Sequence, residues 1–352
     1  MSPENWKSQK YFQPLLLTLR YDNMKNGLIC FFILLHTLKG IGQKTGAPDQ
    51  FIRLYEDNDG INAWGKGTDW GYTNGSRIDF FLHRKKSSSG LLARLFTAGK
   101  ENEIRTTGWG LMQIMITPQK TRPSIPDRND YPYAGALLAL HTLHMAHSGG
   151  KLNLKREWVA GIMGPASFAK ESQILLHRLI GDPRPNGWDY QLPTDLLLNY
   201  NLSIEKQCFN IKGIEFISGG QVAVGTMQSG VACFGIIRFQ KNMASFAGLS
   251  SQYFSTQNQK LAFSVSVKPS AELSLYNALL DGGLFNRQSP VHDQSSKYGT
   301  DLHRRKVSAS AEFIVHLSYK KMGASFNQKI ISPDFKKYNS HQTGNLCIYI
   351  GW

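Results

Sequence analysis

The sequence has few of the residues and motifs by which common enzyme classes are recognised. It contains only four cysteines in 352 residues, at positions 30, 208, 233 and 347, and their spacing forms neither a CxxC pair nor another metal site. We therefore expect no disulfide framework. The GxSxG turn of α/β-hydrolases and the HExxH helix of zinc proteases are absent. The apolar run Leu28–Leu38 has eleven residues and is too short for a membrane-spanning helix.

Acidic residues are also scarce, with 25 Asp and Glu against 40 Lys and Arg, so that the formal net charge is +15. This excess favours an acidic partner, which could be nucleic acid, a phosphorylated small molecule or an anionic lipid surface. Charge alone does not choose among them. With 41% hydrophobic and 18% charged residues, the chain is typical neither of disorder nor of a helical bundle.

The N-terminal region has the pattern of an export signal that begins at Met24. A lysine, the apolar run Leu28–Leu38 and the small residues Gly40 and Gly42 follow in the order of a secretory signal peptide. We expect residues 1–23 to precede the true start, residues 24–42 to be a signal peptide, and residues 43–352 to form the mature domain. The alternative for the apolar run is a buried amphipathic helix.

After residue 50 the sequence is a succession of β-rich segments. Helical periodicity is confined to about two turns around residues 169–179, and no linker or fixed-period repeat interrupts residues 43–352. The pattern predicts one all-β domain with strands at 78–85, 110–117, 135–145, 196–205, 221–227, 231–240, 260–268, 271–280, 308–321, 323–331 and 345–352.

The final segment, NLCIYIGW, favours a particular all-β architecture. It alternates along its length, places Leu346, Ile348, Ile350 and Trp352 on one face, and ends on an aromatic residue. In an exported chain this pattern indicates a transmembrane antiparallel β-barrel, closed because lipid offers no partner to a free strand edge. About 310 mature residues give roughly 26 per strand for twelve strands, enough for membrane-spanning strands and long loops. A soluble β-sandwich remains the alternative.

Three segments carry polar residues that chemistry could use. Residues 55–75, YEDNDGINAWGKGTDWGYTNG, offer carboxylate and amide oxygens, which suit calcium better than zinc, or else form a solvated loop. Residues 117–135 bring three cations together, which suits either phosphate binding or solvation. Residues 171–191 contain a single histidine, His177, that could be structural or catalytic.

The motifs within these segments occur in a recognisable order. An Asn-Asp strand end and TDWGYTNG are followed by TP before DYPYAG, then by GIMGPA, QILLHRLIG and GWDYQ. In this order they resemble the lipid A 3-O-deacylase family of outer-membrane barrels, over about residues 52–200. The resemblance implies a twelve-stranded barrel in the bacterial outer membrane, with an active site between the barrel wall and the outer leaflet. It implies calcium-dependent hydrolysis of the acyloxyacyl ester chain at the 3′ position of lipid A. We expect a monomer that acts on lipopolysaccharide and has no nucleic-acid partner.

The resemblance also assigns site residues. The family's Asn-Asp pair falls on Asn58 and Asp59, with Asp57 as a further calcium ligand because EDND leaves the register open by one residue. The family threonine falls on Thr73. Glu56 and Asp69 are expected to be supporting or solvated.

The remaining assignments lie further along the chain. The histidine base falls on His177, with Gln173 four residues before it binding substrate, and the family's acid on Asp182, where a relative carries Glu. The family's substrate-binding lysine has no gap-free counterpart, so Lys120 is assigned and Arg122 is the alternative. Tyr131 of DYPYAG stands where the family motif has arginine, so any role for that charge is lost.

These residues predict a mechanism without a covalent intermediate. His177 takes a proton from water, Asp182 orients the imidazole, and calcium held at Asn58 and Asp59 stabilises the oxyanion. Thr73 positions substrate or backbone near the cation, and Lys120 meets the lipid A phosphates. Two other classes remain open. One is a non-enzymatic pore or structural barrel. The other is a calcium-dependent outer-membrane phospholipase, which would need a serine nucleophile that no motif supplies.

Overall fold

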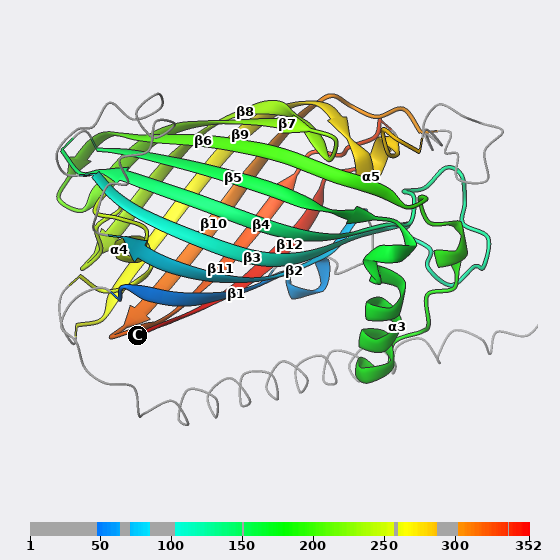
Figure 1. Cartoon of the computed structure of the whole chain (residues 1–352), viewed down its shortest axis with the longest axis horizontal. Coiled ribbons are helices and arrows are strands. Elements are labelled where there is room, and N and C mark those ends of the chain that lie inside the picture. Colours follow the sequence, from blue (N-terminus) through cyan, green and yellow to red (C-terminus); the bar gives the residue numbers. More distant parts are fainter. Residues whose placement is uncertain are drawn as a thin grey trace, which may run out of the picture. The chain divides into compact units, whose positions relative to one another are not determined.

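Twelve antiparallel strands close into one barrel in the computed structural model, which describes residues 48–63, 71–84, 103–149, 151–256, 260–286, 302–336 and 338–352 (Figure 1). Each strand pairs with its neighbours in sequence, and β1 closes the barrel by pairing with β12. The predicted twelve-stranded barrel is confirmed, while the expected extension and signal peptide lie outside the described residues. The strands are β1 Gln50–Asn58, β2 Gly71–Arg84, β3 Glu103–Thr117, β4 Ala134–His147, β5 Leu152–Met163, β6 Asp195–Ile211, β7 Ile214–Gly225, β8 Gln228–Lys241, β9 Ala262–Asn277, β10 Val307–Tyr319, β11 Met322–Ile331 and β12 His341–Gly351.

Period-two alternation sorts the side chains between the membrane and the lumen. In β6, Leu196 and Leu198 point outward and are exposed, whereas Leu197 and Asn199 between and beyond them are buried. The outward row is apolar because it faces hydrocarbon. The same rule decides which of the polar residues in β1 and β2 can reach lipid.

The seam between β1 and β12 uses the C-terminal aromatic residue. Phe51 pairs with Gly351 and Asn58 with Gly344 at the two ends of the shared register. Trp352 donates from Nε1 to Gln50 Oε1 at 3.1 Å and stacks on Phe80 with the ring centroids 5.9 Å apart. The last residue of the chain thus secures the strands that close the barrel.

Several strand predictions are wrong in detail, most clearly at β5 and β9. The pattern does not identify β5, because Lys155 and Glu157 interrupt its apolar residues, yet Glu157 is buried and Lys155 is bound to it at 3.2 Å. Segments 260–268 and 271–280, expected as two strands, form the single strand β9 through Pro269. Pro269 still pairs with Ala311 of β10. On the other side of β9, the pairing with β8 is interrupted between Ser270 and Val267, because proline has no backbone N–H to donate.

The lumen is filled by a network of buried charges. Asp79 accepts hydrogen bonds from Arg53 at 2.6 Å and from Arg77 at 2.9 Å. Arg77 continues the network to Glu157 at 2.9 Å, and Thr142 donates to the same carboxylate at 3.0 Å. Since Asp79 is 1% exposed, each of these charges depends on its partners for solvation.

Short helices and loops close both ends of this lumen. The segment of α4, Ser250–Tyr253, packs Leu249 and Phe254 against Phe51 and Phe81 inside one end. At the other end, Leu279 and Leu280 of α5, Ala278–Asp281, pack against Tyr131 and the lumen-facing residues of β3 and β4.

At the α5 end of the lumen, the connecting loops are held together by buried carboxylates. Asp130 accepts from the backbone N–H of Gln119 at 2.8 Å and from the Tyr338 hydroxyl at 3.0 Å, and burial raises the pKa of its carboxyl. Tyr131 donates to Asp334 at 3.2 Å, and burial likewise raises the pKa of that carboxyl. Tyr131 therefore stabilises the loops at the α5 end of the lumen.

The two ends of the barrel differ in their connections. The described ends of the chain, at β1 and β12, share one end with tight turns such as Ser148–Lys151. The helix α3, Ala169–Ile180, lies at the opposite end (Figure 1). Because outer-membrane barrels have short periplasmic turns and longer extracellular loops, we take the α3 end as extracellular. Within the described ranges, no helix combines the length and apolar character needed to cross a membrane.

Removal of the shared carboxylate by Asp79→Ala should lower the free energy of unfolding by about 3–5 kcal/mol, because two guanidinium groups lose a buried partner. Urea titration of the barrel in lipid vesicles measures this change. The matched control is Asp189→Ala, which breaks the exposed pair with Lys170 and should cost about 1 kcal/mol or less. Equal stability of the two variants would contradict the role assigned to the network.

Candidate functional site

The Asn-Asp turn lies on the outside of the barrel, at the extracellular end of β1. Asn58 caps the 3-10 helix η1, Asp59–Ile61, because its Oδ1 accepts from the backbone N–H of Gly60 at 2.6 Å. This turn rests against Gly344 of β12, where an added Cβ would lie 2.3 Å from the Ile61 carbonyl oxygen. Asp59 begins the helix and is buried.

Thr73 occupies an irregularity at the start of β2. The register between β2 and β3 shifts between Tyr72 and Asn74, so Thr73 is the extra residue of a β-bulge. Its hydroxyl lies 2.6 Å from that of Thr117 on β3, and its side chain is buried. The bulge thereby fixes Thr73 beside Asn74, the residue that pairs with Asn58.

The helix α3 turns its polar residues toward the barrel. Ala169, Gln173 and His177 recur every four residues and are buried along one face of the helix. The helix begins in close contact with β4, since an added Cβ on Gly135 would lie 2.2 Å from Cβ of Ala169. The helix predicted around residues 169–179 is confirmed, and it is one turn longer than expected.

Trp188 links α3 to the barrel wall. Its indole Nε1 donates to Gln173 Oε1 at 2.6 Å, and its ring packs with Met115, Tyr133 and Ala169. Met115 pairs in register with Asn74, and Asn74 with Asn58. This series of contacts brings Gln173, Thr73 and the Asn58 turn to one region of the outer wall.

The ring of His177 is oriented by a backbone carbonyl. Its Nδ1 lies 2.7 Å from the carbonyl oxygen of Pro183. A carbonyl can only accept, so Nδ1 carries the proton and Nε2 is the basic nitrogen. The ring is buried, at 4% exposure.

Asp182, the expected orienting acid, takes a different position. Its carboxylate lies 4.0 Å from His177 Nδ1 and is 55% exposed, while its backbone N–H donates to the His177 carbonyl at 2.8 Å. The backbone of Asp182 therefore helps end the helix, and Pro183 supplies the hydrogen bond to the imidazole.

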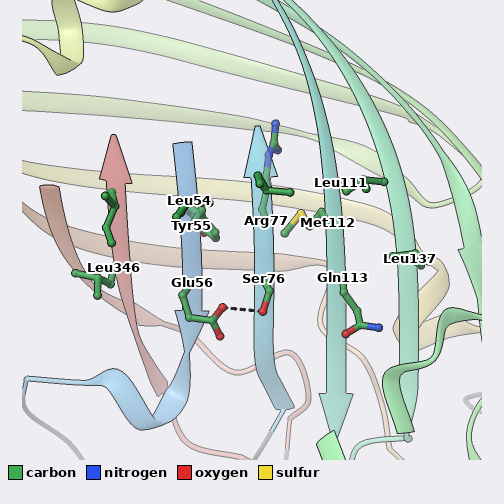
Figure 2. A pocket seen from close by; sticks show the side chains of 12 residues that line it. Leu54, Tyr55, Glu56, Ser76, Arg77, Leu111, Met112, Gln113, Leu137 and Leu346 are labelled. Atoms are coloured by element: carbon green, nitrogen blue, oxygen red, sulfur yellow. Dashed lines mark hydrogen bonds between the residues drawn. The ribbon is translucent and has the colours of Figure 1, made fainter. Parts of the chain in front are cut away.

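A groove of about 470 Å³ lies on the lipid-facing side of this region (Figure 2). Outward side chains of β1 to β4 and β12 line it, and most of them are apolar: Leu54, Ile78, Leu111, Leu137, Leu346 and Ile348. Glu56, Ser76 and Gln113 are the outward polar residues among them, while Tyr55 and Arg77, which also border the groove, direct their polar groups to Asp57 and Asp79 in the lumen. The groove thus combines a hydrocarbon-like wall with a few polar groups, as lipid-binding sites require.

The polar residues of the groove are tied to one another and to the α3 segment. Ser76 donates to Glu56 at 2.7 Å, and Asn74 donates to the other oxygen of the same carboxylate. Gln113 donates from Nε2 to the Ser167 carbonyl at 2.7 Å, just before α3 begins. Sequence reasoning treated Glu56 as a supporting residue and missed Ser76, Asn74 and Gln113.

The remaining assigned residues lie elsewhere. Asp57 alternates with Glu56 and Asn58 and faces the lumen, where it accepts from the Tyr55 hydroxyl at 3.0 Å. Lys120 and Arg122 are exposed in the loop between β3 and β4. Asn186 donates to the Arg122 carbonyl at 2.9 Å, so this loop is joined to the segment after α3. Asp69 lies outside the described residues.

Calcium prefers six to eight oxygen ligands, and the outer end of β1 offers the right chemistry. Asn58 and Asp59 supply an amide and a carboxylate there, whereas Asp57 is on the opposite face of the strand. Within the described ranges, no three His, Cys, Asp or Glu residues are grouped closely enough to hold a metal ion. A calcium ion at Asn58 and Asp59 would need backbone, water or substrate oxygens to complete its shell.

These features define an outer-membrane β-barrel whose candidate site lies on the lipid-facing side of its wall. Residues 28–352 match the family described as outer membrane protein LpxR, and the chain belongs to this family, the lipid A 3-O-deacylases that the motifs indicate. The family and the fold place the protein in the outer membrane.

The fold is also that of a solved structure of this family. LpxR from Salmonella typhimurium has a TM-score of 0.67 at 14% identity, covering 86% of this chain and 100% of that chain. The Bordetella autotransporter BrkA β domain gives 0.42 at 10% identity, with 87% of this chain and 100% of that chain covered. No curated protein matches the chain.

Replacement of Gly135 by valine should loosen α3 without opening the barrel, because the new side chain would occupy the space of Ala169. We expect amides of residues 169–180 to exchange at least tenfold faster, equivalent to about 1.4 kcal/mol. Hydrogen exchange with mass spectrometry measures this. Gly149→Ala is the control, since an added Cβ there meets nothing within 4 Å. Unchanged exchange in α3 would show that the contact does not hold the helix.

Proposed function

We propose that the protein hydrolyses the 3′-linked acyloxyacyl ester chain of lipid A. Membership of the LpxR family supports a lipid A deacylase role. The observation that carries the proposal is His177, buried on the barrel-facing side of α3 with its Nδ1 proton directed to Pro183. This tautomer presents Nε2 as a base at the outer wall, near a groove that suits an acyl chain.

The acyl chain lies along the apolar wall of the groove. Leu54, Leu346 and Ile348 run along adjacent strands in the direction that a lipid chain follows in the leaflet. The ester then sits at the extracellular end, where the polar side chains begin. Lys120 and Arg122 are exposed on the loop joined to the α3 segment and are suited to the phosphates of lipid A.

His177 acts as general base and then as general acid. Nε2 takes a proton from water, and the resulting hydroxide forms a bond to the ester carbonyl carbon. As the tetrahedral intermediate collapses, the bond to the sugar 3′-oxygen breaks and Nε2 returns the proton to that oxygen. One ester and one water give one fatty acid and one alcohol, with no covalent enzyme intermediate.

Gln173 is suited to bind the carbonyl oxygen. Its Oε1 accepts from Trp188, which fixes the amide and leaves Nε2 as the remaining donor. That Nε2 is buried and has no acceptor within the described part of the chain, so an oxyanion would satisfy it. Thr73 holds the β2 bulge beside it through Thr117. Calcium, held by Asn58 and Asp59, would supply positive charge to the same oxyanion.

Alanine in place of His177 should lower the rate of lipid A deacylation by roughly 10²–10⁴-fold, because the water loses its general base. Mass spectrometry of lipid A incubated with the refolded barrel measures the loss of one 3′-linked acyl group. His141→Ala is the control, since His141 packs on Trp109, with the ring centroids 5.3 Å apart, on the outer wall away from α3. Full activity of the His177 variant would rule out its role as base, and loss of phospholipid chains instead would favour a phospholipase.

Substitutions of Asp57 and Asp59 should differ in their effect on the calcium concentration that deacylation requires. Asp59→Asn should raise the calcium concentration for half-maximal deacylation at least tenfold, because a carboxylate ligand is lost. Asp57→Asn should leave it unchanged, since this side chain faces the lumen. Titration of calcium into chelator-treated enzyme measures both. Undiminished activity in excess chelator would exclude calcium from the mechanism. An equal rise of the half-maximal calcium concentration in both variants would contradict the assignment of the calcium site to the outer face of β1.

A further inference from the structure

The helix α3 has three distinct faces, of which the barrel-facing one carries Gln173 and His177. A second face is apolar and exposed. Leu175 is 58% exposed, Leu179 is 75% exposed, and Leu176 lies beside them at 42%. Phe168, directly before the helix, is also exposed, and so is Ile180 at its last residue, which follows the barrel-facing stripe in helical spacing. The third face carries the exposed charges Glu171 and Arg178.

This arrangement differs from that of an ordinary surface helix. A helix on a globular protein buries its leucines and exposes its polar residues. Here the buried stripe is Ala169, Gln173 and His177, while the leucines point away from the barrel. An exposed apolar patch of this size in water would promote association, so it indicates a nonaqueous partner.

The position of α3 identifies that partner. The segment that carries α3 leaves β5 at Met163 and returns to β6 at Asp195, so it begins and ends at the extracellular rim of the barrel. Its start lies against the outward side of the wall, because Gln113 of the groove donates to the Ser167 carbonyl and Gly135 of β4 contacts Ala169. The next outward residues of β6, Leu196 and Leu198, belong to the lipid-facing row. In Figure 1, α3 lies across the long axis of the barrel. A helix in this orientation lies along the membrane plane, since the barrel axis follows the membrane normal.

We propose that the face formed by Phe168, Leu175, Leu176 and Leu179 inserts among the acyl chains of the outer leaflet. The apolar face then continues the lipid-facing surface of the barrel, and Glu171 and Arg178 face the water and headgroups, as in interfacial amphipathic helices. The helix thus sets the depth of His177 relative to the leaflet. This anchoring goes beyond the proposed hydrolysis and does not depend on it.

Spin labels at adjacent positions of α3 test the proposal directly. The variants are Leu179→Cys and, as control, Arg178→Cys, each in a full-length chain whose four native cysteines are replaced by alanine. The labelled barrels are reconstituted in phosphatidylcholine vesicles, and power saturation measures collisions with oxygen and with a water-soluble nickel chelate. We expect the oxygen-to-nickel collision ratio at Leu179 to exceed that at Arg178 several-fold. Equal ratios, with nickel reaching both labels, would overturn the proposal.

A second measurement guards against a label that inserts by its own hydrophobicity. The label is placed by Leu176→Cys, with and without the double change Leu175→Gln and Leu179→Gln. Nickel access should rise in the glutamine variant, because the anchoring face is lost, and unchanged access would contradict anchoring. Dipolar coupling between labels on different barrels, together with protection of Leu179 from both reagents, would assign the face to a second copy of the chain and overturn the proposal.

Discussion

The structure depends on one constraint: in lipid, every backbone N–H and C=O must find a partner within the protein. The pairing of β1 with β12 meets this requirement by leaving no free edge. It also brings the first strand, which carries the acidic segment, beside the last strand, which supplies Leu346 and Ile348 to the groove. Closure and the candidate site therefore share the same strands.

The constraint also explains why the site is on the outside. In the described part of the chain, the lumen is occupied by the charge network around Asp79 and by the packed segments of α4 and α5. The outer wall is already in contact with acyl chains, and a lipid can reach it by lateral diffusion. Polar groups on that wall are stabilised by one another, as Glu56 is by Ser76 and Asn74. The helix α3 then covers this region with a polar face turned inward.

Sequence reasoning predicted the barrel because alternation and closure are properties of local pattern and of lipid. Helical periodicity predicted α3, and its spacing places Gln173 and His177 on one face. The assignment of His177 as the base came from the family resemblance and stays a prediction. Sequence reasoning assigned Asp57 to calcium because the register of EDND was open by one residue, although alternation along β1 directs Asp57 to the lumen and Glu56 to the lipid side. It could not foresee that Pro183 binds the imidazole, because any residue carries a carbonyl and only the loop conformation directs it.

The carbonyl of Pro183 has a consequence for how the site tolerates change. A carboxylate partner can be removed by a single substitution, and it loses its charge in acid. A backbone carbonyl is neither removed by a substitution nor protonated in acid. The orientation of the ring is thus independent of side-chain identity at this position and of the acidity of the surroundings. It also adds no negative charge where a phosphorylated lipid would bind. The orientation of the imidazole depends instead on the conformation of the chain after Gly181. The positive φ of this glycine, 74°, lets the chain turn back toward the ring.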